Sequence, residues 1–207
     1  MLKRDAQLSL AILLLGAALG EGAEQTFAVD VAQSRMTVSV EKSGMFSFAG
    51  HEHEVLATAI EGTVVADTAE VARSSVRLRF ASAGLKVSGK GEPPEDVPKV
   101  QDRMLGAETL DVARFPEIEF HSTLVEGREA PAGTWNLRVT GDLTIHGQTQ
   151  KLTLPVRVQI TGDALTASGQ AVIKQTDFGI KPISIGGVVK VKNELGLDYK
   201  IVGKAAH

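Results

Sequence analysis

The feature that most constrains the fold of this chain is a hydrophobic period of two, which dominates from residue 25 onward. Successive side chains of a β-strand point to opposite faces, so this alternation is typical of antiparallel strands with one buried and one solvated face. The alternating segments are 35–41, 75–81, 135–145 and 151–160. Turn signals separate the segments: Glu126-Gly127, Ala132-Gly133, His146-Gly147, Gly162-Asp163 and Gly186-Gly187.

Strand number and turn length favour a barrel over an open sheet. The pattern predicts about eight evenly spaced strands, and full closure leaves no exposed edge. His146-Gly147-Gln148 and Thr161-Gly162-Asp163 are short enough to be hairpins between long strands. We therefore predict an all-β chain built as a closed antiparallel barrel.

One segment, 93–110, departs from the period of two. Val97, Val100, Met104 and Leu105 follow the i, i+3, i+7, i+8 spacing of an amphipathic helix. We predict one short helix over about 94–106, packed at one mouth of the barrel.

The N-terminus has the pattern of a secretory signal peptide. Lys3 and Arg4 precede Leu8–Leu19, an uncharged apolar run of 12 residues that is too short to span a bilayer as a helix. Small residues then allow cleavage after Gly20 or Gly22. We predict a signal peptide at 1–20 and a mature, single-domain protein at 21–207 in the periplasm. An uncleaved anchor is the alternative.

Composition excludes several classes of protein. The formal net charge is −3 and no basic cluster is present, which argues against a nucleic-acid or anionic-membrane partner. No cysteine is present, so lipid attachment at a lipobox thiol and disulfide bonds are both excluded. No apolar stretch after residue 20 approaches the length of a membrane span. The sequence also lacks nucleophile-elbow, P-loop and dinucleotide-binding motifs, so we do not expect an enzyme.

A histidine pair is the most notable polar motif. On a strand, His51 and His53 share a face and could present two imidazoles to one metal ion. Zinc needs a third protein ligand, for which His121 is the candidate. The alternative is that His51 and His53 are mouth residues that hydrogen-bond to neighbouring strands or contact a ligand head group.

An apolar ligand cavity is the second candidate site. An interior of about eight strands is either filled by side chains or holds one small ligand, and periodicity does not distinguish the two. The low aromatic content of 4% and many small residues favour an open interior. The side chains we expect to line it are Phe46, Phe48, Met104, Leu105, Leu137, Val139, Leu143, Leu154 and Phe178.

Four segments of the chain resemble the YceI-like family of bacterial polyisoprenoid-binding proteins. They are Phe-Ala-Val-Asp at 27–30 with Ala-Gln-Ser at 32–34, the string at 105–120 containing Asp-Val-Ala-Arg-Phe-Pro-Glu-Ile-Glu-Phe, Gly-Asp-Leu-Thr-Ile-His-Gly-Gln-Thr at 141–149, and Thr-Asp-Phe-Gly-Ile at 176–180. The resemblance covers roughly residues 25–203. It implies an eight-stranded antiparallel lipocalin-like barrel with a helix across it. It also implies a periplasmic location and an elongated pocket for a polyprenyl chain or a prenylated quinone, with no required cofactor. Family members that form dimers allow a homodimer here.

The chain departs from the family pattern near the expected mouth. Gln33 stands where the family commonly has histidine, 43–53 carries the His-Glu-His string, and the loop 88–98 is rich in glycine and proline. The ligand can therefore differ from that of better-known members. Two alternatives to a lipid carrier remain: a metal-assisted enzyme built around His51 and His53, and a packed, non-binding stress-response barrel.

Overall fold

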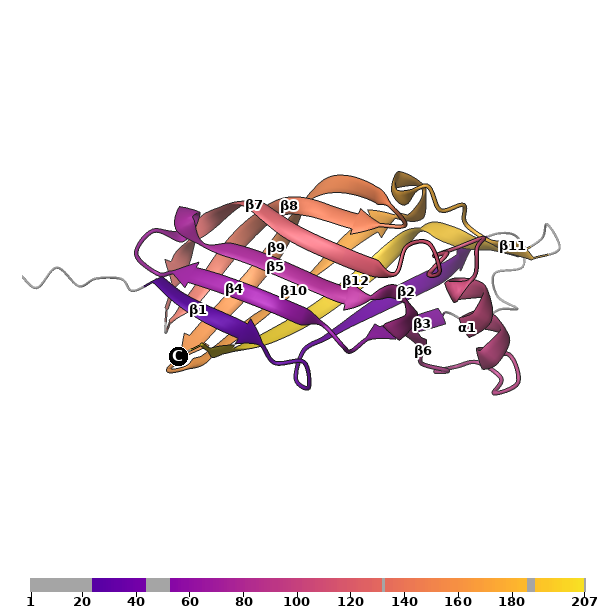
Figure 1. The fold of residues 1–207 in the computed structure, drawn as a ribbon, viewed down its shortest axis with the longest axis horizontal. Helices are drawn as coiled ribbons and strands as arrows, with labels where there is room; N and C mark the ends of the chain where they lie inside the picture. The colour runs from indigo at the N-terminus through magenta and orange to yellow at the C-terminus, as the bar shows by residue number, and fades with distance from the viewer. Residues whose placement is uncertain (1–23, 44–52, 132, 186–188, 207) are drawn as a thin grey trace, which may run out of the picture.

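A computed structural model describes residues 24–43, 53–131, 133–185 and 189–206 of the 207-residue chain. These residues form one elongated antiparallel barrel, with the C-terminus at the end opposite the helix (Figure 1). The predicted site residues Phe46, Phe48 and His51, and the predicted turn at Gly186-Gly187, lie outside the described residues.

The described residues form a sheet of twelve strand segments, one α-helix and three short 3-10 turns. The strands are β1 (Glu24–Val29), β2 (Arg35–Ser43), β3 (His53–Ala57), β4 (Glu61–Asp67), β5 (Ser75–Ala81), β6 (Lys86–Val87), β7 (Glu117–Ala130), β8 (Thr134–Ile145), β9 (Gln148–Thr161), β10 (Ala164–Lys174), β11 (Ser184–Ile185) and β12 (Val189–Ala205). The helix is α1 (Val97–Leu105), and the 3-10 turns are η2 (Val71–Arg73), η3 (Ser82–Gly84) and η4 (Gln175–Phe178).

Eight strands close the barrel, because three of them are each made of two segments. β1 and β2 both pair with β12 and together form one strand of the barrel. The second strand is formed by β4, which pairs with β1, and β3, which pairs with β2. The third is formed by β5, which pairs with β4, and β6, which pairs with β3. The ring runs β1-β4-β5-β7-β8-β9-β10-β12 and closes through the pairing of β1 with β12. The predicted eight-stranded antiparallel barrel with one short helix is confirmed.

Both predicted hairpins are present. The β8–β9 turn places His146 at φ 52° and Gly147 at φ 70°, and two left-handed residues in sequence match the twist of the flanking strands. The β9–β10 turn begins with Gly162 at φ 55° and joins Thr161 to its partner Ala164. These two turns fix the register of three long strands.

The turn predicted at Glu126-Gly127 is wrong, because β7 continues through it. Gly127 has φ 146° and pairs with Leu137 of β8, and a Cβ atom there would lie 2.3 Å from the Asn136 carbonyl oxygen. Glycine inside a strand marks a close backbone approach or a local distortion as well as a turn. Here it permits close contact between two strands.

The helix α1 begins slightly later than predicted, at Val97, with Pro98 in its first turn. It lies at the end of the barrel where β3 and β6 also lie (Figure 1). The Gln101 side chain fixes it to β6, accepting a hydrogen bond from Val87 N–H and donating one to the Leu85 carbonyl, both at 2.8 Å. We call this the helix end of the barrel.

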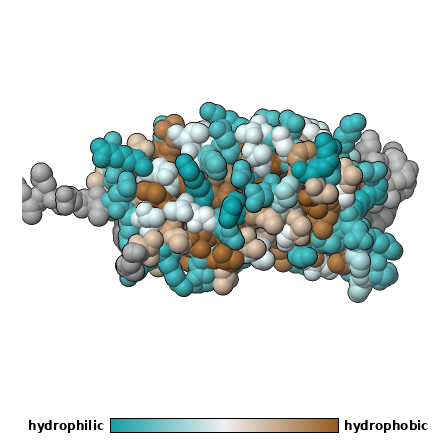
Figure 2. Space-filling view, viewed as in Figure 1, coloured by the Kyte–Doolittle hydropathy of each residue, from teal (hydrophilic) through white to brown (hydrophobic). Residues whose placement is uncertain are grey.

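The opposite end is closed by a tight apolar cluster. Phe27 and Leu165 are fully buried there at 0% and 1% exposure, and they pack with Trp135 and Val158. On the face of the barrel shown in Figure 2, polar side chains are interspersed with apolar areas. The buried and cavity-lining residues of the strands are mostly apolar, so the apolar faces point inward, as the alternation predicts.

The ladder between β9 and β10 covers only part of their length. It runs from the Thr161–Ala164 pair to the Arg157–Ser168 pair and stops there, although both strands continue toward the helix end. Pro155 has no N–H to donate beyond that point. We call the unpaired stretch the β9–β10 seam; η4 crosses it, with Gln150 Nε2 donating to the Asp177 carbonyl at 2.6 Å.

Candidate functional site

The interior of the barrel holds an apolar cavity of about 330 Å³. All eight strands contribute to its lining, together with α1 and η4. Along β12 the lining extends from Val191 to Ile201, which is roughly 33 Å of strand and about 25 Å along the axis of a barrel with tilted strands. The cavity is therefore long and narrow.

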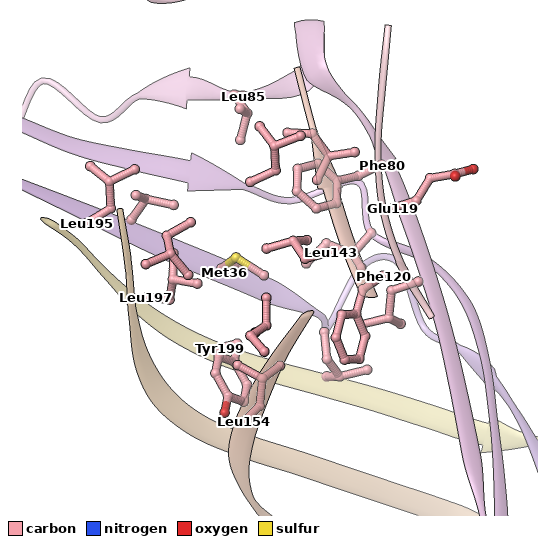
Figure 3. A pocket seen from close by; sticks show the side chains of 18 of the residues that line it. Met36, Phe80, Leu85, Glu119, Phe120, Leu143, Leu154, Leu195, Leu197 and Tyr199 are labelled. Carbon is pink, nitrogen blue, oxygen red and sulfur yellow. The ribbon is translucent and has the colours of Figure 1, made fainter. Parts of the chain in front are cut away.

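Most of the described side chains predicted to line a cavity do so. Met104, Leu137, Val139, Leu143, Leu154 and Phe178 are all part of the lining. Figure 3 shows Leu143 and Met36 pointing toward each other across the interior. Leu105 is not part of the lining: it is half-buried and packs against the core cluster that contains Phe178.

Of the three candidate histidines, the two that the structure describes, His53 and His121, lie on opposite sides of the barrel wall. His53 lines the cavity, and its Nδ1 lies 2.6 Å from Glu92 Oε1, whose side chain is only 2% exposed. His121 is exposed on β7, in register with Arg77 and Asp142. Among the described residues, no group of three or more His, Cys, Asp or Glu could hold a metal ion.

Glu92 was not identified by the sequence reasoning. It lies in the 88–98 loop, where its only signal was a departure from the family pattern in glycine and proline content. A carboxylate buried this deeply needs a partner, and the imidazole of His53 provides it.

Tyr199 is a second polar group on the cavity wall. Its hydroxyl donates to the Pro155 carbonyl at 2.6 Å, so β12 is fixed to β9 across the intervening β10. The side chain crosses β10 at Gly169, where a Cβ atom would lie 2.2 Å from the Pro155 oxygen and 2.5 Å from the Tyr199 hydroxyl. Burial raises the pKa of Tyr199 to about 12, and the negative charge of Asp198 adds to the shift. This contact lies where the β9–β10 ladder stops.

Thr109 is another polar residue of the lining, and its hydroxyl has no hydrogen-bond partner. It lies in the turn after α1, where its backbone N–H donates to the Gly106 carbonyl at 3.1 Å. The residue is part of the cavity lining, and its hydroxyl oxygen is buried and is the one buried side-chain N or O atom of the described residues without a hydrogen bond. The sequence reasoning did not identify Thr109, because alternation gives no information about residues in turns.

The described residues include no helix of the length and apolarity needed to cross a membrane.

A closed eight-stranded antiparallel barrel around a long apolar cavity defines a fold of the lipocalin-like class. Residues 27–202 match the model of the YceI-like domain, and the chain belongs to that family.

The chain is also similar to curated relatives, and its fold is similar to that of solved structures. The chain is 27% identical over 190 residues to UPF0312 proteins of Pseudomonas savastanoi pv. phaseolicola and Pseudomonas syringae pv. syringae, covering 84% of this chain and 87% of each relative. Its fold is similar to that of Burkholderia cenocepacia BcnA, with a TM-score of 0.66 and 22% identity over 84% of this chain and 98% of that one. It is also similar to a polyisoprenoid binding domain from Saccharophagus degradans implicated in plant cell wall breakdown, with a TM-score of 0.64 and 11% identity over 88% of this chain and 100% of that one.

Proposed function

We propose that this protein is a periplasmic carrier that holds a polyisoprenoid, or a similar long apolar lipid such as a prenylated quinone, inside its barrel. The observation that carries the proposal is the cavity itself: it is apolar, about 330 Å³ in volume, and extends along most of the barrel. Its volume is at the lower end of the range for ligand pockets, and its narrow shape fits a chain better than a compact molecule.

The energetics of the cavity support a ligand-binding role. At about 24 cal/mol per Å³, a cavity of this size costs roughly 8 kcal/mol relative to a packed core. That is comparable to the total free energy of unfolding of a typical domain. A barrel that functions only through its outer surface has no need for such a cavity, since larger side chains would remove it.

An apolar chain also gains binding free energy from this lining. Each buried CH₂ group contributes ~0.8 kcal/mol, so a prenyl tail can bind with few polar contacts. The solved neighbour described as a polyisoprenoid binding domain supports this class of ligand.

The proposed location rests on the first residues of the chain. The apolar run Leu8–Leu19, preceded by Lys3 and Arg4, fits a signal peptide at 1–20 that directs residues 21–207 to the periplasm. The mass of the intact chain tests the proposed location. The chain recovered from the periplasm should be lighter than the chain retained by a secretion-blocked strain, by the mass of the signal peptide. Recovery of the uncleaved chain from the membrane fraction would contradict it.

The direct test of the function is to purify the protein from periplasm without detergent, extract it with organic solvent and analyse the extract by mass spectrometry. We expect a prenyl lipid at a substantial fraction of the protein concentration. An extract without lipid, combined with failure of the protein to take up prenyl lipids added in solution, would contradict the proposal.

A pair of adjacent variants tests whether the lipid lies inside the barrel. Leu137 of β8 lines the cavity, whereas its neighbour Arg138 is exposed on the outer face. Leu137→Trp should fill part of the cavity and reduce the bound lipid severalfold, and Arg138→Trp should leave it unchanged. Circular dichroism checks that both variants fold. Equal lipid content in both variants would place the lipid elsewhere.

A further inference from the structure

The cavity lies directly behind the β9–β10 seam. Leu152, Leu154 and Val156 of β9 and Ile173 of β10 belong to this stretch, and all four line the cavity. Both strands are described over their whole length, and their ladder does not continue into the seam. Along the seam the wall is therefore closed by side-chain packing and by η4 instead of by a backbone ladder.

The short turn η4 is attached more firmly to β12 than to β9. Thr176 N–H donates to Asn193 Oδ1 at 3.0 Å, and Asn193 Nδ2 donates to Thr176 Oγ1 at 2.9 Å. Gln175 Nε2 adds a bond to the Lys192 carbonyl at 2.8 Å. η4 also follows β10 directly in the chain. When β9 moves away from β10, we expect η4 to stay with β10 and β12.

Few hydrogen bonds hold β9 to the other side of the seam. Of the described residues, three pairs bridge it through a side chain: Gln150 Nε2 with the Asp177 carbonyl at 2.6 Å, His146 Nδ1 with the Phe178 carbonyl at 3.3 Å, and the Tyr199 hydroxyl with the Pro155 carbonyl at 2.6 Å. A separation of similar length between β8 and β9 would break a ladder of eight register pairs, from Ile145–Gln148 to Arg138–Pro155. The seam therefore opens with a much smaller loss of hydrogen bonds than the neighbouring ladder.

Apolar side chains lie on both faces of the wall at the seam. Val172, on the outer face of β10, is 67% exposed and is the most exposed large hydrophobic side chain of the described residues. The next residue, Ile173, lines the cavity, and so does Phe178 of η4, which is 2% exposed. An apolar chain that crosses the seam therefore has apolar contacts outside the barrel as well as inside it.

We propose that the lipid tail enters and leaves the cavity sideways, through the β9–β10 seam, as β9 separates from η4 and β10. The proposal rests on the proposed function and adds the route of ligand exchange. The unpaired stretch of β9, 149–156, is roughly 23 Å of strand. A slit of that length admits several segments of a long chain at once, whereas entry through the helix end requires the chain to be threaded segment by segment.

The experiment closes the seam with a covalent cross-link. Since the chain has no cysteine, an introduced pair reacts specifically. Gln150→Cys with Asp177→Cys places two exposed thiols across the seam, within reach of a short bifunctional thiol reagent. Native mass spectrometry then follows the uptake and release of geranylgeraniol by the delipidated protein over time. Compared with the double variant before cross-linking, both rates should fall about tenfold or more, with the affinity unchanged.

Two further cross-links serve as controls. Thr140→Cys with Thr153→Cys joins β8 to β9, where the hydroxyl oxygens lie 2.8 Å apart beside a complete ladder. Glu54→Cys with Lys90→Cys fixes the 88–98 loop to β3 at the helix end, in place of an ion pair of 3.7 Å. Neither cross-link should change the rates of uptake or release. Circular dichroism checks that all cross-linked proteins are folded.

A single variant tests the same route without a cross-link. Gln150→Ala removes one of the bonds that bridge the seam, so uptake and release should both become about threefold to tenfold faster. The matched control is Gln159→Ala, because Gln159 is exposed on the same strand where β9 is paired with β10. It should leave both rates unchanged.

The outcomes separate the route from the function. Unchanged rates after cross-linking of the seam would overturn the lateral route while leaving a lipid carrier intact. The same holds if the helix-end cross-link slows exchange as much as the seam cross-link does, or if Gln150→Ala does not accelerate it. Failure of the wild type to take up the probe would instead refute the proposed function, and with it this proposal.

Discussion

Tyr199 allows a direct test of the electrostatics of the cavity wall, because it is the only tyrosine in the chain. The tyrosinate absorbance of the folded protein therefore titrates this one group. Its ordinary pKa is 10.0, and we expect a midpoint of about 12, since burial opposes the phenolate and Asp198 adds like-charge repulsion. Asp198→Asn should lower the midpoint only slightly, because burial is the larger cause.

The raised pKa also fixes how stability depends on pH. The folded state holds the phenolic proton more tightly than the unfolded chain, so this contribution is fully present below pH 10 and is lost as pH rises toward 12. The shift corresponds to at most about 2.7 kcal/mol, which solvent screening reduces to about 1–2 kcal/mol. Tyr199→Phe removes the hydrogen bond to Pro155, at about 0.5–1.5 kcal/mol, but it also removes the titration.

Denaturant unfolding, followed through the single tryptophan, Trp135, measures both proteins across this pH range. Wild type should be the more stable at pH 8, and its advantage over Tyr199→Phe should shrink or reverse above pH 11. Deprotonation of lysines affects both proteins equally and cancels in the difference. A midpoint near the ordinary pKa, or a constant stability difference, would refute the assignment of Tyr199 as a buried phenol in the wall.

Three further predictions concern the barrel framework. The Asp30 carboxylate accepts a hydrogen bond from Lys204 at 2.8 Å, and this bond, together with those from Gln33, lowers the pKa of Asp30 to about 2. Asp30→Asn should therefore destabilise the protein above pH 4, and this effect should disappear as pH falls toward 2, as measured by urea unfolding. Gly147→Ala places a Cβ atom 2.5 Å from an aromatic ring carbon at positive φ, and it should lower the free energy of unfolding by roughly 1–3 kcal/mol; an unchanged Tm would contradict that geometry. Hydrogen exchange followed by NMR tests where the β9–β10 ladder ends. In residues 149–156, the amides that point away from β8 should exchange fast, whereas in 157–161 the amides that point toward β8 and those that point toward β10 should both exchange slowly. Equal protection of the two segments would mean that the ladder is complete.

The overall architecture was predictable from the sequence because it depends on local patterns. The alternation in 135–145 and 151–160 reports which side of a strand is buried, and His146-Gly147 supplies the two left-handed residues that a tight hairpin needs. Glu126-Gly127 misled the prediction, because glycine allows close packing between strands as readily as a turn.

The polar part of the candidate site was much less predictable. The pairing of His53 with Glu92 joins residues 39 positions apart, and nothing in the spacing indicates it. The Thr109 hydroxyl stands out only because it is buried without a hydrogen-bond partner, and this can be known only from the folded structure. The inward-facing leucines and valines of β8 and β9 were found because their position follows from strand periodicity.

The β9–β10 seam gives the two ends of the barrel different mechanical properties. At the Phe27 end, continuous hydrogen-bond ladders between neighbouring strands hold the strands at a constant spacing and so fix the width of the barrel. At the helix end the spacing of β9 and β10 is set by side-chain packing and by the contacts of η4, such as the bond from Gln150. A small separation of β9 from β10 at the helix end therefore breaks fewer backbone hydrogen bonds than the same separation at the Phe27 end, so the barrel can widen more easily at the helix end.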